Sequence, residues 1–199
     1  ELFRATKQGG VVIWVVGDAT VKGSETGTSF KQALRFIELG FNLHDTMIYS
    51  KSGFKNPSND RYHQTFEYMF VFSKGKPKTF NPIKDRKNKY AGIHGGEKSF
   101  RDEYGKRFNV WYYPNGGNNT TKDKVFKHPA VFPEQLANDH IISWSNEGDV
   151  VYDPFGGSGT TCKMAYLSKR KCIMSEISTE YCELSKQRLS EYLSRGLFA

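Results

Sequence analysis

The sequence lacks any apolar run that approaches the roughly 18 residues needed to span a membrane as a helix. Its first ten residues are polar and do not contain the apolar core of a secretory signal peptide. These absences predict a cytoplasmic protein. The 37% share of hydrophobic residues predicts one globular domain with a core, large enough to carry a smaller inserted lobe.

Cysteine is scarce, and its spacing is typical of neither a zinc site nor a disulfide framework. The three cysteines, Cys162, Cys172 and Cys182, lie ten residues apart, so we expect three reduced thiols in a cytosolic protein. The histidines also show no spacing of metal ligands, and we expect no metal: His44, His63, His94 and His140.

Acidic residues are sparse in one segment, which holds all the excess positive charge. Residues 74–127 contain 14 Lys and Arg against 5 Asp and Glu, a net charge of +9, and the remainder of the chain carries −1. This asymmetry fits a surface that faces a polyanion, although a solvated loop would show the same composition. The segment has no sustained periodicity and is predicted to be rich in loops.

Hydrophobic patterns predict alternating strands and helices elsewhere. Residues 11–17 form a continuous apolar run, typical of a strand buried on both faces. Phe30, Ala33, Leu34 and Ile37 follow a helical spacing that predicts a buried helix face, with Gly40 ending the helix. Further strands are predicted at 46–49, 66–72, 150–152 and 171–175, and further helices at 132–144, 159–168 and 178–194, the last with Ser178 as N-cap.

The most informative stretch lies between a predicted strand and a predicted helix. It reads Asp153-Pro154-Phe155-Gly156-Gly157-Ser158-Gly159-Thr160-Thr161. Glycines allow a sharp turn and close approach of the backbone to a ligand, and the following helix start presents unpaired N–H groups. The next strand ends at Glu176, where a carboxylate can accept hydrogen bonds from both hydroxyls of a ribose.

Three nucleotide ligands fit such a loop to different degrees. A phosphate-binding loop ends in Gly-Lys-Ser/Thr, whereas Gly159 is followed by two threonines, which disfavours ATP and GTP. A dinucleotide fingerprint has glycine where Cys162 stands, which weakens NAD. S-adenosylmethionine remains, since its ribose suits Glu176 and its sulfonium tolerates a nearby acid such as Asp153.

The Asp153–Thr161 string resembles the cofactor motif of bacterial and phage DNA methyltransferases that modify the amino group of adenine (N6) or cytosine (N4). The resemblance also covers residues 127–133 and 175–182, and two core strands at 10–17 and 66–74. It implies a Rossmann-like α/β fold that is circularly permuted in the β arrangement, with the cofactor motif near the C-terminus. It also implies a catalytic domain at 1–74 and 127–199, with a loop-rich DNA-recognition insert at 75–126.

The site residues follow from this resemblance and from the charge distribution. The residues expected to bind the cofactor are Asp153, Pro154, Phe155, Gly156, Gly157, Ser158, Gly159, Thr160, Thr161, Glu176, Ile177, His128, Pro129 and Phe132. The residues expected to contact DNA phosphates are Lys84, Arg86, Lys87, Lys89, Arg101, Lys106, Arg107, Lys122 and Lys124. Three neighbouring aromatic residues are candidates to stack on a base or to form a small core: Trp111, Tyr112 and Tyr113.

Adjacent prolines are absent, and this bears on catalysis. The family that the chain resembles uses an Asp/Asn/Ser-Pro-Pro-aromatic loop, which accepts hydrogen bonds from the target amino group and stacks on the flipped base. All seven prolines of this sequence are isolated, so we assign no catalytic residue within it. Residues 1–7 read like the last turns of a helix, and we expect the loop, with its strand, upstream of Glu1.

Two functional hypotheses follow. The first is an S-adenosylmethionine-dependent DNA methyltransferase of restriction–modification or phage type. The second is a cofactor- and DNA-binding part that needs another segment to complete its active site. Double-stranded DNA is the expected substrate, RNA is the less favoured one, and a second copy or a complementing N-terminal segment is the candidate protein partner.

Overall fold

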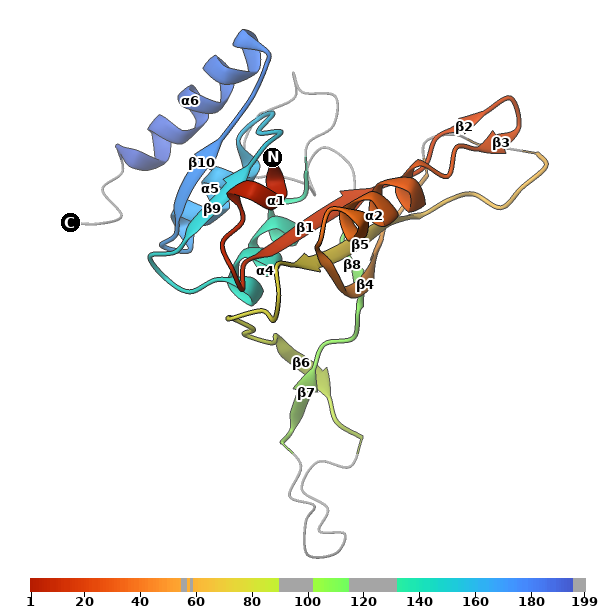
Figure 1. Ribbon diagram of the computed structural model, residues 1–199, viewed down its shortest axis with the longest axis horizontal. Helices are drawn as coiled ribbons and strands as arrows, with labels where there is room; N and C mark the ends of the chain where they lie inside the picture. The colour runs from red at the N-terminus through yellow and green to blue at the C-terminus, as the bar shows by residue number, and fades with distance from the viewer. Residues whose placement is uncertain (55–56, 58, 90–101, 115–131, 195–199) are drawn as a thin grey trace, which may run out of the picture. The chain divides into compact units, whose positions relative to one another are not determined.

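The structure is a computed structural model that describes all 199 residues except 55–56, 58, 90–101, 115–131 and 195–199 (Figure 1). The chain divides into two compact units. Unit 1 comprises residues 1–49 and 67–111, and unit 2 comprises residues 50–66 and 112–199. The boundaries expected from the sequence, with an insert at 75–126, stay a prediction.

Unit 1 is built on a four-stranded sheet with the order β1-β5-β4-β8. β1 and β5 are antiparallel, with Val11 opposite Ser73 and Val16 opposite Tyr68. The remaining elements of this unit are two helices and two small hairpins. The bounds are α1 (Leu2–Ala5), β1 (Val11–Val16), β2 (Thr20–Val21), β3 (Ser24–Glu25), α2 (Thr28–Glu38), β4 (Asn42–Ser50), β5 (Phe66–Ser73), β6 (Lys84–Lys87), β7 (Tyr104–Lys106) and β8 (Val110–Tyr112).

Aromatic side chains form the core between α2 and the sheet. Phe36 of α2 stacks on Phe72 of β5 with ring centroids 4.4 Å apart, and Ala33, Phe41 and Phe70 complete the buried cluster. Offset aromatic pairs of this kind contribute beyond their buried area. The packing therefore fixes which side of α2 faces the sheet.

Two expectations about burial in unit 1 are wrong. Phe30, Leu34 and Ile37 were expected on the buried face of the helix, but all three are exposed because Ala33 and Phe36 take the contact with the sheet. Residues 11–17 were expected to be buried on both faces, but every residue of β1 is half-buried. In the described part of the chain, β1 has one neighbouring strand, β5, and an edge strand is covered less than a central one.

Unit 2 contains a parallel pair of strands covered by helices. β9 (Val150–Asp153) pairs with β10 (Lys171–Met174), and α5 (Thr160–Leu167) packs on both strands. α4 (Glu134–Trp144) and α6 (Thr179–Leu193) pack on α5. The bounds predicted from the sequence differ from the observed ones by at most two residues. Ser178 is the N-cap of α6, as predicted, and its hydroxyl accepts a hydrogen bond from the Tyr181 N–H at 3.3 Å.

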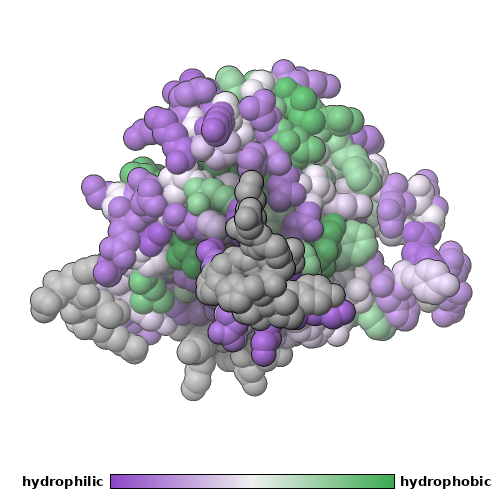
Figure 2. Space-filling model, turned by 90° about the horizontal axis from the view of Figure 1, so that it is seen from below, coloured by the Kyte–Doolittle hydropathy of each residue, from purple (hydrophilic) through white to green (hydrophobic). Residues whose placement is uncertain are grey.

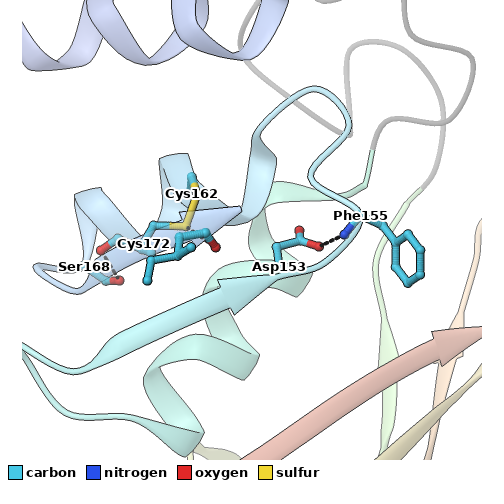
Figure 3. Close-up of a disulfide and its surroundings, with 7 residues drawn as sticks. Asp153, Phe155, Cys162, Ser168 and Cys172 are labelled. Carbon is cyan, nitrogen blue, oxygen red and sulfur yellow. Dashed lines mark hydrogen bonds between the residues drawn. A yellow bond between two sulfur atoms is a disulfide. The ribbon is translucent and has the colours of Figure 1, made fainter. Parts of the chain in front are cut away.

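A disulfide joins two of the three cysteines. Cys162 of α5 is bonded to Cys172 of β10, and Cys182 is free (Figure 3). The expectation of three reduced thiols is therefore wrong for this pair. β10 follows α5 directly in the sequence, and α5 packs on it. Two positions ten residues apart therefore lie close together, with the Cα atoms of Cys162 and Cys172 5.2 Å apart.

Reduction of this disulfide is expected to lower the free energy of unfolding by about 3 kcal/mol, because the bond restricts the unfolded chain by closing a short loop. Urea unfolding with and without dithiothreitol measures the difference. The Cys162→Ala/Cys172→Ala variant should show no such difference, and Cys182→Ala should keep it. Equal stability of the oxidised and reduced parent chain would contradict the expectation.

Candidate functional site

The glycine loop, residues 153–159, connects the end of β9 to the start of α5. Asp153 begins the turn, and its Oδ1 accepts a hydrogen bond from the Phe155 N–H at 3.0 Å (Figure 3). The Gly159 N–H donates to the Gly156 carbonyl at 2.8 Å and closes the turn. Gly159 is the N-cap of α5 with φ +78°, where glycine avoids the strain that a side chain would bring.

Glu176 lies against the glycine loop. β9 and β10 are parallel with Asp153 opposite Met174, so the segments that follow the two strands emerge at the same edge of the sheet. The Glu176 Oε2 accepts from the Gly157 N–H at 2.8 Å, and its Oε1 accepts from the Ser178 N–H at 2.8 Å. A carboxylate is an acceptor with two oxygens, the chemistry that hydroxyl donors of a ligand require.

Two apolar side chains are exposed, one on the glycine loop and one directly after Glu176 in the sequence. Phe155 is 72% exposed and Ile177 is fully exposed. The Phe155 ring points away from the side of the loop that carries the disulfide (Figure 3). A carboxylate bonded to a loop that carries an exposed apolar side chain suits a ligand with a polar hydroxylated part and a flat apolar part.

The other residues expected at the cofactor are placed in different ways. Ser158 and Thr160 are buried, and the hydroxyls of both accept hydrogen bonds from Arg188 of α6, so neither hydroxyl faces the surface. Asp153, Pro154, Thr161 and Phe132 are half-buried. His128 and Pro129 lie outside the described residues.

Sequence reasoning missed the buried charges of unit 2. Glu134 of α4 pairs with both Lys163 of α5 and Arg188 of α6 beneath the glycine loop. These residues are far apart in the sequence, and no local pattern links them. The one indication is that all three charged residues lie on the buried sides of their helices. Charged residues are rarely buried without a partner, so such positions suggest that the charges pair with one another.

A second buried polar group lies on α4. The Asp139 carboxylate accepts from the Tyr113 hydroxyl and from the Gln135 amide, each at 2.6 Å. Burial lowers the pKa of the neighbouring His140 to about 3, and the negative charge of Asp139 opposes this shift in part. His140 is therefore a neutral core residue at neutral pH.

Four basic residues of the middle segment lie on β6 and β7: Lys84, Arg86, Lys87 and Lys106. Two of them lie close to aromatic rings. The Arg86 guanidinium lies 4.7 Å from the centroid of Phe108, and the Lys106 ammonium lies 5.5 Å from that of Phe80. β6 and β7 are antiparallel, with Lys84 opposite Lys106. Hydrophilic side chains also make up most of the face of the molecule drawn in Figure 2.

Some of the expected phosphate contacts are engaged within the protein. Arg107 pairs with Asp85, and this hydrogen bond lowers the pKa of the Asp85 carboxyl. Lys84 pairs with Asp102 at 3.1 Å across an exposed surface. Lys87 and Lys89 are exposed, and three further candidates lie outside the described residues: Arg101, Lys122 and Lys124.

The three neighbouring aromatic residues at and directly after the end of β8 alternate between core and surface. Trp111 and Tyr113 are buried, whereas Tyr112 is 63% exposed. Two of the three candidates for base stacking thus belong to the core.

Metal-ligand clusters and membrane-spanning helices are absent from the part of the chain that the structure describes. The residues outside the masked ranges contain no group of three or more His, Cys, Asp or Glu that could hold a metal ion. None of the helices in that part of the chain is long and apolar enough to cross a membrane.

Comparison with known proteins places these features in a family. The sequence model of the N6_N4_Mtase family, described as DNA methylase, matches residues 1–187. The chain is 60% identical over 210 residues to the orphan methyltransferase M.BamHII of Bacillus amyloliquefaciens, covering 97% of this chain and 79% of that protein. It is 31% identical to the type II methyltransferase M.MjaI of Methanocaldococcus jannaschii, covering 95% of this chain and 64% of that protein.

Solved structures show the same fold. The PvuII DNA methyltransferase (cytosine-N4-specific) aligns with a TM-score of 0.71 and 24% identity, over 92% of this chain and 64% of its own. The complex of M1.HpyAVI with SAM aligns with a TM-score of 0.64 and 26% identity, over 92% of this chain and 76% of its own. The α/β methyltransferase fold expected from the sequence is confirmed.

Proposed function

The chain belongs to the N6_N4_Mtase family of DNA methylases, and on this premise we propose that it is the cofactor-binding part of an S-adenosylmethionine-dependent DNA amino-methyltransferase. The reaction would transfer a methyl group from the cofactor to the exocyclic amino group of adenine (N6) or cytosine (N4). The names of M.BamHII and M.MjaI and the SAM complex of M1.HpyAVI support this assignment.

One observation carries the proposal: the Glu176 carboxylate is bonded to the Gly157 N–H of the glycine loop. This contact supports a role for Glu176 as ribose acceptor, because the carboxylate lies beside a loop whose backbone a ligand can approach closely. The Phe155 and Ile177 side chains, both exposed, would cover the apolar faces of the adenine. His128 and Pro129 keep their proposed place beside the methionine part on family resemblance alone.

A triphosphate ligand has less support at this loop. A phosphate-binding loop carries a lysine that reaches the phosphates. Lys163, the first lysine after the glycine loop, is buried and bonds to Glu134 at 2.6 Å. Its ammonium group therefore lies in the protein interior and does not face a ligand at the loop.

The residues of this chain would bind and orient the cofactor, whose sulfonium supplies the methyl group. The acceptor amino group needs a second set of contacts, which the isolated prolines of this sequence do not offer. We therefore infer that another segment completes the active site. In the described residues β9 has β10 as its one partner strand and exposes Val150 and Tyr152, which supports room for a further strand.

Double-stranded DNA is the proposed substrate, and the hairpin formed by β6 and β7 is its proposed contact surface. Paired cations and aromatic rings suit phosphates together with sugar or base faces. A homodimer has no supporting observation in the described residues, so a complementing segment is the favoured protein partner.

The Lys84→Ala/Lys87→Ala variant is expected to weaken duplex binding by several fold. Each lost phosphate contact should also reduce the slope of log affinity against log salt by about 0.9. Fluorescence anisotropy at several salt concentrations measures both, with Lys31→Ala/Arg35→Ala on α2 as the charge-matched control. An unchanged salt slope would show that β6 does not contact DNA. Tighter binding of duplex RNA than of duplex DNA would favour an RNA substrate.

The proposed function is tested by joining the chain to a segment that carries the Asp/Asn/Ser-Pro-Pro-aromatic loop. Incubation with unmethylated DNA and labelled S-adenosylmethionine, followed by nucleoside analysis, should yield labelled N6-methyladenine or N4-methylcytosine. The labelled product decides between the two bases. Cofactor binding without any labelled nucleoside would reject the assignment as a DNA methyltransferase and favour a binding module.

A further inference from the structure

Three charged side chains meet in the interior of unit 2, beneath the glycine loop. The Glu134 Oε1 accepts from the Arg188 Nη2 and from the Lys163 Nζ, each at 2.6 Å. The side chains of Arg188 and Lys163 are each 3% exposed, and that of Glu134 is 15% exposed. We call these three residues the buried ion cluster.

The buried ion cluster reaches the glycine loop through Arg188. The Arg188 Nη1 donates to the Ser158 carbonyl and to the Thr160 hydroxyl, each at 3.0 Å. The Ser158 carbonyl belongs to the peptide unit that leads into Gly159, where the backbone turns into α5 with a positive φ. Arg188 therefore binds the loop on both sides of Gly159.

A second contact from α6 restricts the same point. A side chain at Gly159 would meet the Ser185 Cβ at 3.0 Å, so the loop and this helix are in close contact. Ser185 and Arg188 are three residues apart and lie on the same face of α6. The two halves of the loop thus have separate supports, Glu176 at Gly157 and α6 at residues 158–160.

The energetics favour a specific role for these charges. Burying three charged groups has a large desolvation cost, and well-packed apolar residues are often equal or better for stability alone. What the cluster provides that apolar packing would not is a fixed set of donors to the loop backbone.

We propose that Arg188 is a positioning residue, which holds residues 158–160 of the glycine loop in the conformation that receives the cofactor. Glu134 fixes the guanidinium, and Lys163 fixes Glu134. Arg188 acts from the inner side of the loop and leaves the outer side open to the ligand. This inference rests on the proposed function, because it assumes that S-adenosylmethionine binds at this loop.

The test compares S-adenosylmethionine affinity in the full chain with Arg188→Met, Arg188→Lys and the control Lys186→Met. Lys186 lies on the same helix but is exposed, where it pairs with Glu183. Calorimetric titration should show Kd raised at least about tenfold by Arg188→Met, because a hydrogen bond to a charged group is lost at the loop. Arg188→Lys should give a smaller rise, because lysine cannot donate in two fixed directions like a guanidinium.

A readout without ligand separates positioning from general stability. Amide hydrogen exchange at residues 158–161 should be faster in both Arg188 variants, while the amides of β9 and β10 keep their protection. If Arg188→Met does not fold, Arg188→Lys carries the test alone. Kd within twofold of the parent, or exchange that rises equally over the whole of unit 2, would overturn the inference. Failure of the parent chain itself to bind would instead count against the proposed function.

Discussion

The 199-residue chain is expected to leave DNA unmethylated, with transfer at least about 1,000-fold slower than in the same chain joined to the Asp/Asn/Ser-Pro-Pro-aromatic loop. The target amino group is a weak nucleophile, because its lone pair is delocalised into the base. Precise orientation of two reactants contributes up to roughly 7–11 kcal/mol to such a step. This sequence holds no Pro-Pro pair that would provide the orientation.

The measurement is incorporation of label from S-adenosylmethionine into duplex DNA, with the two polypeptides compared at equal concentration. A joined polypeptide whose loop aromatic residue is replaced by alanine serves as the matched control, since it has the added length without the stacking ring. Turnover by the 199 residues alone at a rate close to that of the joined polypeptide would show that other residues orient the base.

Replacing Glu176 by alanine is expected to raise the Kd for S-adenosylmethionine at least about 100-fold. Two hydrogen bonds between a carboxylate and the ribose hydroxyls are worth roughly 1.5–3 kcal/mol each. The same substitution removes the acceptor of the Gly157 N–H and so releases one support of the glycine loop. Both effects weaken binding.

Two further variants make this result specific. Glu176→Gln keeps one carbonyl oxygen and should give an intermediate Kd, because an amide nitrogen cannot accept from a hydroxyl. Glu180→Ala removes an exposed acid from the first turn of α6 and should leave the Kd unchanged. A Kd for Glu176→Ala within threefold of the parent would exclude Glu176 as the ribose acceptor.

Local patterns predicted the elements of unit 2 well because their limits are set by local chemistry. Ser178 caps α6 with its own hydroxyl, and Pro133 precedes α4 directly, one residue before the first helical position. Gly159 begins α5 because the turn requires a positive φ. In each case the deciding interaction lies within a few residues of the signal.

Contacts between elements distant in the sequence decide which side of α2 is buried. The apolar stripe of α2 is wider than its contact with the sheet, so spacing alone could not tell that Ala33 and Phe36 are buried while Leu34 and Ile37 are exposed. The stacking of Phe36 on Phe72, 36 positions further along the chain, selects the buried side. The hairpin of β6 and β7 also escaped detection, because its strands are short and charged.

The candidate site shows the same division. The glycine loop and Glu176 were predictable because a strand, a turn and a helix start follow one another in the sequence. The hydrogen bond from Arg188 to Ser158 and the ion pair of Arg188 with Glu134 could not be predicted, because they join residues 30 and 54 positions apart. The Cys162–Cys172 bond was missed because it depends on α5 lying directly over β10.

The central claim is that the glycine loop and Glu176 form a pocket for S-adenosylmethionine. The most direct test is calorimetric titration of the unmodified chain with this cofactor and, separately, with ATP. The account predicts saturable heat with S-adenosylmethionine at one molecule per chain and none with ATP. Tight uptake of ATP, with no heat from S-adenosylmethionine, would contradict it.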